Sequence, residues 1–200
     1  MLATYTPDDT RSLTFKFINN DLEARVPSRL TLNELRADPR DAGKTFVNRP
    51  TGGGDTADAE LAAQGREDRR TIVGARYEHK LSSATDWRIL GTYDVKDINQ
   101  TFSTIGDNIN SNFQMATDLT HRNTLLGFNA THHAGLFFNH MDVESSNFFN
   151  RADGVPGRRG ALQSQTRGYH QNFGGRVREE VQFSPAWTAV LGVGAPRPPP

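Results

Sequence analysis

Two stretches of strict alternation between apolar and polar residues constrain the fold of this chain more than any other feature. The first joins Thr71–Leu81 to Trp87–Ile98 across the polar segment Ser82–Asp86. An alternation with a period of two is typical of a strand that has one apolar and one polar face. Because only a short polar segment separates the two runs, they are predicted to pair as an antiparallel hairpin.

The two faces of this hairpin differ in chemistry. The apolar face carries Val73, Tyr77, Leu81, Trp87, Ile89 and Tyr93, and the charged face carries Arg76, Glu78, Lys80, Arg88 and Asp94. A soluble sandwich turns its polar face to water, whereas a membrane barrel turns its apolar face to lipid and its polar face to a wet lumen. Each run has about the 9–11 residues that a tilted membrane-crossing strand needs. Trp87, the first predicted strand residue after the turn, has the position of an interfacial girdle residue.

A second hairpin repeats this plan near the end of the chain, where Arg176–Phe183 and Trp187–Val193 flank the turn Ser184–Ala186. The polar face is predicted to carry Arg176 and Arg178, and the apolar face, which Glu179 interrupts, to carry Val181, Phe183 and Trp187. The two hairpins together predict an antiparallel meander with short turns at one end and long loops at the other.

Other segments give weaker predictions. Ser12–Asn19 alternates like a strand, with a bulge or turn at Asn19–Asp21 before Leu22–Val26 resumes it. Thr31 and Glu34 fit a capping box, which predicts a short helix that Pro39 closes. The remaining predictions are a flexible glycine loop at 51–55, a helical turn at Asp58–Gln64, one or two short strands within Leu136–Phe149, and no readable pattern over most of Asn99–Gly168.

The composition excludes several classes of protein. The 200 residues are 35% hydrophobic and contain no long apolar run, which excludes helical membrane spans but not the half-polar strands of a barrel. The formal net charge is zero, so there is no electrostatic argument for nucleic acid as a partner. Since the chain has no cysteine, it has neither disulfides nor thiolate sites.

Three stretches resemble the β-barrel of TonB-dependent outer-membrane receptors of the ferric-siderophore type: Leu22–Asn33 with Arg36–Pro39, Arg70–His79, and Asn172–Glu180. The resemblance extends over roughly Leu13 to Gly194. It implies an all-β fold that forms part of a transmembrane barrel of about 22 strands. It also implies a place in the lipid of the bacterial outer membrane, with a ferric siderophore as the transported ligand and the TonB complex as the energy-coupling partner.

The ends of the sequence lead to an expectation about its extent. Met1–Asp9 has no signal-peptide pattern, and the proline-rich end 195–200 cannot continue a strand. No plug domain or TonB box is visible, so residues 1–200 are expected to be an internal fragment of the barrel domain. Four or five strands cannot close a pore, and the fragment alone is expected to form an open, curved sheet with poorly packed loops.

No segment predicts an enzyme, a cofactor site or a metal site. Gly43–Thr45 matches the last residues of a phosphate-binding loop, but the earlier glycine and the preceding strand of that motif are missing. His132, His133 and His140, near Asp142 and Glu144, have no tight metal-ligand spacing and fit a solvated loop better. No nucleophile with a base, and no paired carboxylates, suggest catalysis. The arginines of the polar faces have two possible interpretations: they attract an anionic chelate, or they pair with neighbouring acidic residues. The second interpretation is favoured.

The first functional hypothesis is therefore a fragment of an outer-membrane receptor that takes up ferric siderophores. The alternative belongs to another class: a soluble β-rich binding or adhesion domain with long recognition loops. Extraction from the outer membrane only by detergent distinguishes the first hypothesis from the second, which predicts a soluble monomer. A hydrolase on a β scaffold is a weaker third hypothesis, because it requires a polar constellation that the sequence does not contain.

Overall fold

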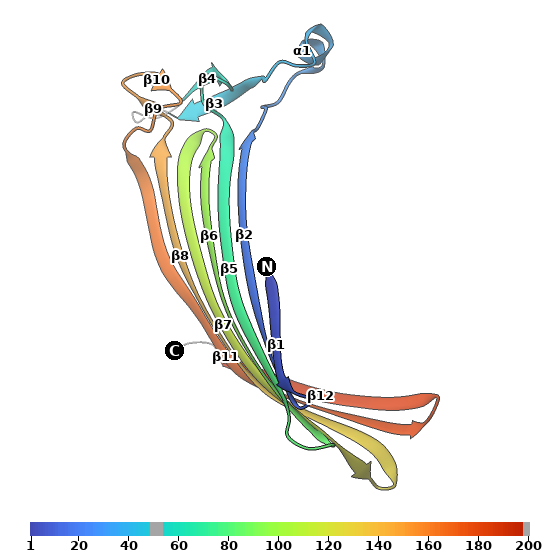
Figure 1. Ribbon diagram of the computed structural model, residues 1–200. Helices are drawn as coiled ribbons and strands as arrows, with labels where there is room; N and C mark the ends of the chain where they lie inside the picture. Colours follow the sequence, from blue (N-terminus) through green and yellow to red (C-terminus); the bar gives the residue numbers. More distant parts are fainter. Residues whose placement is uncertain (49–53, 198–200) are drawn as a thin grey trace.

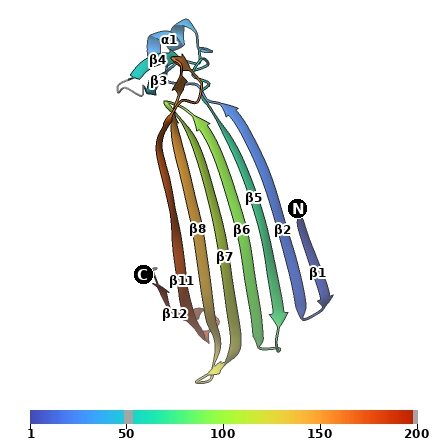
Figure 2. The same ribbon diagram turned by 90° about the vertical axis from the view of Figure 1, so that its left-hand side faces the viewer.

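One antiparallel sheet of eight strands forms most of the computed structural model, which describes residues 1–48 and 54–197 (Figures 1 and 2). In spatial order, the strands are β1 (Leu2–Asp8), β2 (Arg11–Arg25), β5 (Gly65–Lys80), β6 (Thr85–Thr101), β7 (Thr104–Leu125), β8 (Phe128–Phe149), β11 (Leu162–Ser184) and β12 (Trp187–Arg197). Strands that are consecutive in this order pair with each other, and β1 and β12 form the two edges of an open sheet. The expected all-β, antiparallel fold is thus confirmed.

The two ends of the sheet are built differently. At one end, β1–β2, β5–β6, β7–β8 and β11–β12 are joined by turns of two to four residues. At the other end, residues 26–64 contain α1 (Leu32–Ala37), β3 (Lys44–Asn48) and β4 (Gly54–Asp58), and residues 150–161 contain β9 (Arg151–Ala152) and β10 (Val155–Pro156). Figure 1 shows these segments gathered at the top of the sheet, with α1 on the inner side of its bend. The connection from β6 to β7 is the short one at this end, because it consists of Phe102 and Ser103.

Both predicted hairpins are present. β5 pairs with β6 through residues 81–84, and β11 pairs with β12 through Pro185 and Ala186. The strands are longer than predicted, and two boundaries were wrong: Leu81 lies just beyond the end of β5, and Trp87 is the third residue of β6 rather than its first. Trp187 is the first residue of β12, as expected.

The region with no readable sequence pattern holds the longest hairpin of the sheet. β7 and β8 each have 22 residues, so the expectation of one or two short strands within Leu136–Phe149 was wrong. Their turn consists of Leu126 and Gly127, which both have positive φ angles of 51° and 85°. Such angles belong to the tight turns that match the twist of a hairpin, and Asn-Gly is the sequence usually found there. Leu-Gly gives no such signal.

The smaller predictions had mixed outcomes, and two of them lie partly outside the described residues. β2 pairs with β5 without a register shift at Asn19–Asp21, so there is no bulge. The predicted helical turn at Asp58–Gln64 is present after the end of β4, where the Ala62 amide donates to the Asp58 carbonyl (2.9 Å), the i to i−4 bond of a single helical turn. Residues 51–53 of the predicted glycine loop and residues 198–200 of the proline-rich end lie outside the described residues, whereas Gly54 and Asp55 begin β4. The expectation that the proline-rich end cannot continue a strand was wrong for its first residues, because β12 extends to Arg197 and Pro196 pairs with Gly174.

Helix α1 begins with the predicted capping box. The Glu34 amide donates to Thr31 Oγ1 (3.3 Å), and the Thr31 amide donates to Glu34 Oε2 (2.8 Å). These hydrogen bonds satisfy backbone donors that a helix start leaves unpaired. The bonds from the Thr31 amide and hydroxyl also lower the pKa of Glu34, because they favour its charged form.

Most of the buried side chains of the described residues lie among the loops, although Ile105 and Ala130 of the sheet are buried too. Val47, Ala59 and Ala62 are buried among the loops, and so is the side chain of Asn150. Asn150 Nδ2 donates to the carbonyls of Ala62 (2.9 Å) and Phe102 (2.7 Å), and its Oδ1 accepts from the Gly157 amide (2.9 Å). One side chain therefore ties three connections together, and the expectation of poorly packed loops was wrong. Within the described residues, no helix is long and apolar enough to span a membrane.

We expect Asn150→Ala to loosen this loop cluster while leaving the sheet intact. The change leaves backbone groups of Ala62, Phe102 and Gly157 without their partner, and each buried unpaired group costs about 1–3 kcal/mol. Hydrogen exchange should accelerate in residues 58–64 and 150–161 but not in the middle of β6. Asn147→Ala is the control, because Asn147 donates only a long bond to Ser164 Oγ (3.3 Å) in the same region. Equal effects of the two changes would contradict the role given to Asn150.

We also expect α1 to lose helical structure in acid. A carboxyl group with a lowered pKa stabilises the folded state at pH values above its usual pKa, and this contribution is lost as the pH falls through the lowered value. NMR chemical shifts of residues 32–37 should therefore move toward coil values over that acidic range. Glu34→Gln keeps a capping side chain that does not ionise, so its shifts should not follow the pH. The same pH response in both proteins would refute the proposed cause.

Candidate functional site

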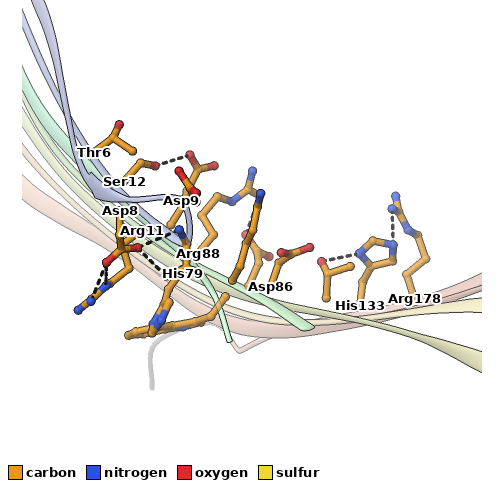
Figure 3. Close-up of a pocket in the computed structure, with 16 residues that line it drawn as sticks. Thr6, Asp8, Asp9, Arg11, Ser12, His79, Asp86, Arg88, His133 and Arg178 are labelled. Carbon is orange, nitrogen blue, oxygen red and sulfur yellow. Dashed lines mark hydrogen bonds and ion pairs between the residues drawn. The ribbon is translucent and has the colours of Figure 1, made fainter. Parts of the chain in front are cut away.

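The register of the sheet separates two faces with different chemistry. Directly paired residues of neighbouring strands lie on the same face of a sheet. Val73 pairs with Tyr93 and Tyr77 pairs with Ile89, so these four side chains share one face. Glu78 pairs with Arg88 on the opposite face, where Ile72 also pairs with Asp94. We call these the apolar face and the polar face. In Figure 3, Asp86, His133 and Arg178 of the polar face lie on the inner side of the bend of the sheet.

Asp118 is the centre of the polar face. Its Oδ2 accepts from Arg88 on β6 (2.9 Å), and its Oδ1 accepts from Arg176 on β11 (2.6 Å). The Asp118 side chain is 19% exposed, whereas the two arginines are 50% and 58% exposed. One carboxylate thus holds two guanidinium groups, and the group of three has a net charge of +1.

The bond between Asp118 and Arg176 spans a whole strand. Asp118 on β7 pairs with Gly135 on β8, which in turn pairs with Arg176 on β11. The two charged side chains meet over Gly135, where a Cβ atom would lie 2.5 Å from Asp118 Oδ1 and 3.1 Å from Arg176 Nε. A glycine is therefore needed at this position for the ion pair to form as observed.

Most other predicted polar-face residues also have partners of opposite charge. Arg76 lies 3.5 Å from Glu78, and Arg178 lies 2.7 Å from Glu180. Asp94 accepts two bonds from Arg70, at 3.0 and 2.6 Å. Lys80 lies opposite Asp86 in the register. Since exposed ion pairs contribute little to stability, this network serves mainly to fix the directions of the side chains and to balance their charge.

A groove of about 620 Å³ lies at the turn end of the sheet (Figure 3). The β1–β2 turn forms one wall, and the lower ends of the central strands form the floor. Its charged lining residues, excluding histidine, are Asp8, Asp9, Arg11, Glu78, Lys80, Asp86, Arg88, Asp118 and Arg178. Both signs are present in similar numbers, so the groove is a wet polar surface rather than an anion or cation trap.

The apolar face has no covering layer in the described part of the chain. Val73 is 50% exposed, Tyr93 49% and Val177 55%. Tyr77 and Trp87 make an edge-to-face contact, with ring centroids 5.7 Å apart, and the Trp87 indole N–H donates to Thr117 Oγ1 (2.8 Å). Val181 pairs with Ala189 of β12 on this face, and Phe183 contacts Phe128. Trp187, beside the β11–β12 turn, is 75% exposed.

The histidines do not lie in a solvated loop, as the sequence had suggested. His132, His133 and His140 all belong to β8, and the register places His132 on the apolar face and His133 on the polar face. Over residues 1–48 and 54–197, no group of three or more histidine, aspartate or glutamate side chains is arranged to hold a metal ion. Gly43 precedes strand β3 rather than a helix, so Gly43–Thr45 is not a phosphate-binding loop.

Sequence reasoning found the arginines of this site but missed Asp118 and Gly135. Both residues lie in the region without a recognised pattern, so neither was assigned to a strand or a face. Once a 22-residue strand is assumed, alternation from Ala116 to Thr120 places Asp118 on the polar face. The signal for Gly135 is three-dimensional, because only the register shows which side chains cross it.

We expect Gly135→Ala to separate Asp118 from Arg176 and to destabilise the sheet by about 1–2 kcal/mol. The added methyl group occupies the space in which the two side chains meet. Gly91→Ala is the matched control, since nothing lies within 4 Å of a Cβ at this strand position. In an Arg176→Gln background, the cost of Gly135→Ala should shrink, as measured by a double-mutant cycle of unfolding free energies. Additive effects would show that the ion pair does not depend on this glycine.

Comparison with known proteins identifies the fold. No family model and no curated protein matches the sequence. Among solved structures, the chain is similar to the unliganded ferric citrate transporter FecA, with a TM-score of 0.76 and 11% identity over 96% of this chain. It is also similar to P. aeruginosa FpvA bound to pyoverdine–iron complexes, with a TM-score of 0.72 and 10% identity over 98% of this chain.

The match covers 31% of FecA and 29% of FpvA, so this chain spans about a third of the length of either protein. Both are TonB-dependent receptors, the class that the sequence resembles. The resemblance is therefore confirmed at the level of the fold: the chain has the architecture of one sector of the β-barrel of such receptors.

Proposed function

We propose that this chain is a sector of the wall of an outer-membrane barrel that takes up a ferric siderophore or a similar iron chelate. The observation that carries the proposal is the two-faced sheet, whose exposed apolar face and paired polar face fit lipid on one side and a wet lumen on the other. The likeness to FecA and FpvA supports it, because one is named a transporter of ferric citrate and the other is bound to pyoverdine–iron complexes.

The stagger of the turns supports a tilted, membrane-crossing sheet. Arg11 at the start of β2 lies in one line across the sheet with Val177, yet β11 runs seven residues further, to Ser184. Seven residues over five strand-to-strand steps correspond to a tilt of roughly 45°, given a rise of about 3.3 Å per residue and a strand spacing of about 4.8 Å. Membrane barrels have strands tilted by about 35–45°.

The apolar band follows the same stagger. On β2 it consists of Leu13, Phe15 and Phe17, whereas on β11 it reaches down to Phe183. Toward the loops, the same face becomes polar, and Asp21 pairs there with Arg69 (2.9 Å) and Glu144 with Arg167 (2.7 Å). A band of limited height with charged residues beyond it is the pattern of a barrel wall that leaves the membrane.

The proposal gives each group of predicted residues a role. Val73, Tyr77, Leu81, Trp87, Ile89, Tyr93, Val181, Phe183 and Trp187 face lipid or the membrane interface, and Arg76, Glu78, Lys80, Arg88, Asp94, Arg176 and Arg178 face the lumen. The loop-rich end, with α1 and Asn150, faces the cell exterior, because outer-membrane barrels have short periplasmic turns and longer outer loops. In the intact receptor, the TonB complex supplies the energy for uptake.

Uptake of radiolabelled iron by cells tests this proposal. Cells that express the intact protein should take up an iron chelate in an energy-dependent manner, and deletion of its gene should abolish that uptake. The protein should leave the outer-membrane fraction only in detergent. Recovery of the intact protein as a soluble monomer would instead favour a soluble β-rich binding domain.

We expect Val73→Arg to cost about 2–4 kcal/mol if Val73 lies near the middle of the bilayer, because a charge on the lipid face loses its hydration. Arg88→Ala should cost much less, since Arg88 faces the wet lumen and Asp118 keeps its bond to Arg176. Unfolding free energies of the intact protein in lipid vesicles measure both changes. Equal costs at the two positions would contradict a lipid-facing apolar side.

A further inference from the structure

A row of amide side chains follows strand β7 on the polar face. Asn108, Asn110, Asn112 and Gln114 occupy every second position, and they are in phase with Asp118 further along the strand, so all of them lie on the polar face. In the sequence they form the pattern Asn-x-Asn-x-Asn-x-Gln. We call these four residues the amide row. The row lies between the ion pairs of Asp118 and the loop-rich end of the sheet.

The strands next to the amide row continue its uncharged chemistry. Four sets of directly paired residues cross β7, β8 and β11: Asn108–Ser145–Thr166, Asn110–Val143–Gly168, Asn112–Met141–His170 and Gln114–Asn139–Asn172. None of these described residues is an acid, a lysine or an arginine, and His170 is the one titratable side chain among them. We call this surface the neutral patch. It measures about 20 Å along the strands and about 10 Å across them.

Much of the hydrogen-bonding capacity of the neutral patch is free. Asn112 Oδ1 accepts from Asn139 Nδ2 (2.9 Å), and Asn108 Oδ1 accepts from Ser145 Oγ (2.6 Å). The amide nitrogens of Asn108 and Asn112 remain available as donors. Within the described residues, no hydrogen bond engages the side chains of the other two members of the amide row. The patch therefore presents neutral donors and acceptors to whatever occupies the lumen.

The charged residues beside the amide row on β6 are held on the far side of that strand. Asp94, which pairs with Asn112 in the register, lies 2.6 Å from Arg70, and Lys96 lies 4.0 Å from Asp68. Both ion pairs link β6 to β5, away from the patch. The neutral patch thus differs from the lower part of the polar face, where charged side chains surround Asp118.

Apolar side chains lie among the amides of the patch. Met141 and Val143 are half-buried between the amide row and β11. Gly168 leaves open space beside Val143, because nothing lies within 4 Å of a Cβ at that position. Apolar surface with a few neutral polar groups is typical of a site for a small organic molecule. The flexible side chain of Met141 can adapt to an irregular ligand surface.

We propose that the neutral patch binds the cargo, and that this cargo is an iron chelate of the hydroxamate type with no net charge. The inference rests on the proposed uptake function and adds the chemical class of the chelate. A hydroxamate carries a single negative charge, so three of them balance Fe(III), whereas three doubly charged catecholates leave a strongly anionic complex. Amide nitrogens of the row donate to the carbonyl oxygens of the neutral complex, and its organic groups contact Met141 and Val143.

The position of the patch agrees with this role. A cargo that enters from the loop-rich end reaches the neutral patch before it reaches the charged residues around Asp118. An anionic complex would lose hydration at the patch without meeting a cation there, which is unfavourable. A neutral complex exchanges hydrogen bonds with water for equivalent bonds with the amides.

Binding to the purified intact protein in detergent tests this inference, with a neutral ferric trihydroxamate and an anionic ferric triscatecholate as probes. We expect the neutral complex to bind about tenfold more tightly or better, with a Kd that changes little as salt is raised, because no ion pair is involved. Asn110→Ala combined with Asn112→Ala should weaken its binding about tenfold through the loss of two hydrogen bonds. Ser111→Ala is the matched control, since Ser111 lies between them on the opposite face.

Thiol labelling provides a second measurement that does not remove an amide. Gly168→Cys places a thiol in the open space of the patch, and Gln182→Cys places one on the same face of β11 near the turns. Both cysteines should react with a water-soluble reagent in the absence of cargo. The neutral complex should slow the reaction at 168 about tenfold or more and leave that at 182 unchanged.

Tighter binding of the anionic complex would overturn the inference, and so would equal binding of the neutral complex by the double variant and the Ser111→Ala control. An unreactive cysteine at 168 in the absence of cargo would also overturn it, because another segment of the intact protein would then cover the patch. Uptake by cells separates this inference from the proposed function. Failure to take up any iron chelate would contradict the proposed function, whereas uptake of the anionic complex alone would contradict only this inference.

Discussion

The constraint on which this structure depends is a sheet with an apolar face that nothing in the described chain covers. Most domains bury the apolar side of a sheet against a second layer. Here the described part of the chain has one layer, and most of its few buried side chains lie among the loops rather than beneath the strands. The hydrogen-bond ladder defines the sheet, but residues 1–48 and 54–197 supply no covering layer for rows such as Leu13, Phe15 and Phe17. Lipid is the environment that makes such a surface favourable.

On the polar face, many charged side chains lie close together, so side chains of opposite charge must be neighbours. A single aspartate, Asp118, joins arginines from strands on both sides of it, and Gly135 leaves the space that one of these pairs needs. The result is a wall with alternating charge that stays hydrated. Such a surface agrees with the transport function proposed above.

Much of this fold follows from local rules, and the failures have physical causes. The hairpins at 71–98 and 176–193 were predictable because a period of two exposes the faces of a strand directly. The hairpin β7–β8 was not, because its turn uses Leu126 and Gly127 in place of the usual turn residues, and because its upper halves are polar on both faces. The arginines of the polar face could be found by alternation. The contact between Asp118 and Arg176 over Gly135 could not, because it depends on the register between residues that are 17 or more positions apart in the sequence. Likewise, Glu179 was visible as an interruption, but its contact with His132 was not.

Chemical labelling along β5 tests most directly that the two faces of the sheet meet different media. The 200 residues contain no cysteine, so single cysteines can be placed at each position from Ile72 to Glu78 of the intact protein in its membrane. If the account is correct, cysteines at 73, 75 and 77 react with a lipid-soluble reagent, and those at 72, 74, 76 and 78 with a water-soluble one. Reactivity with the water-soluble reagent at every position, without alternation, would contradict it.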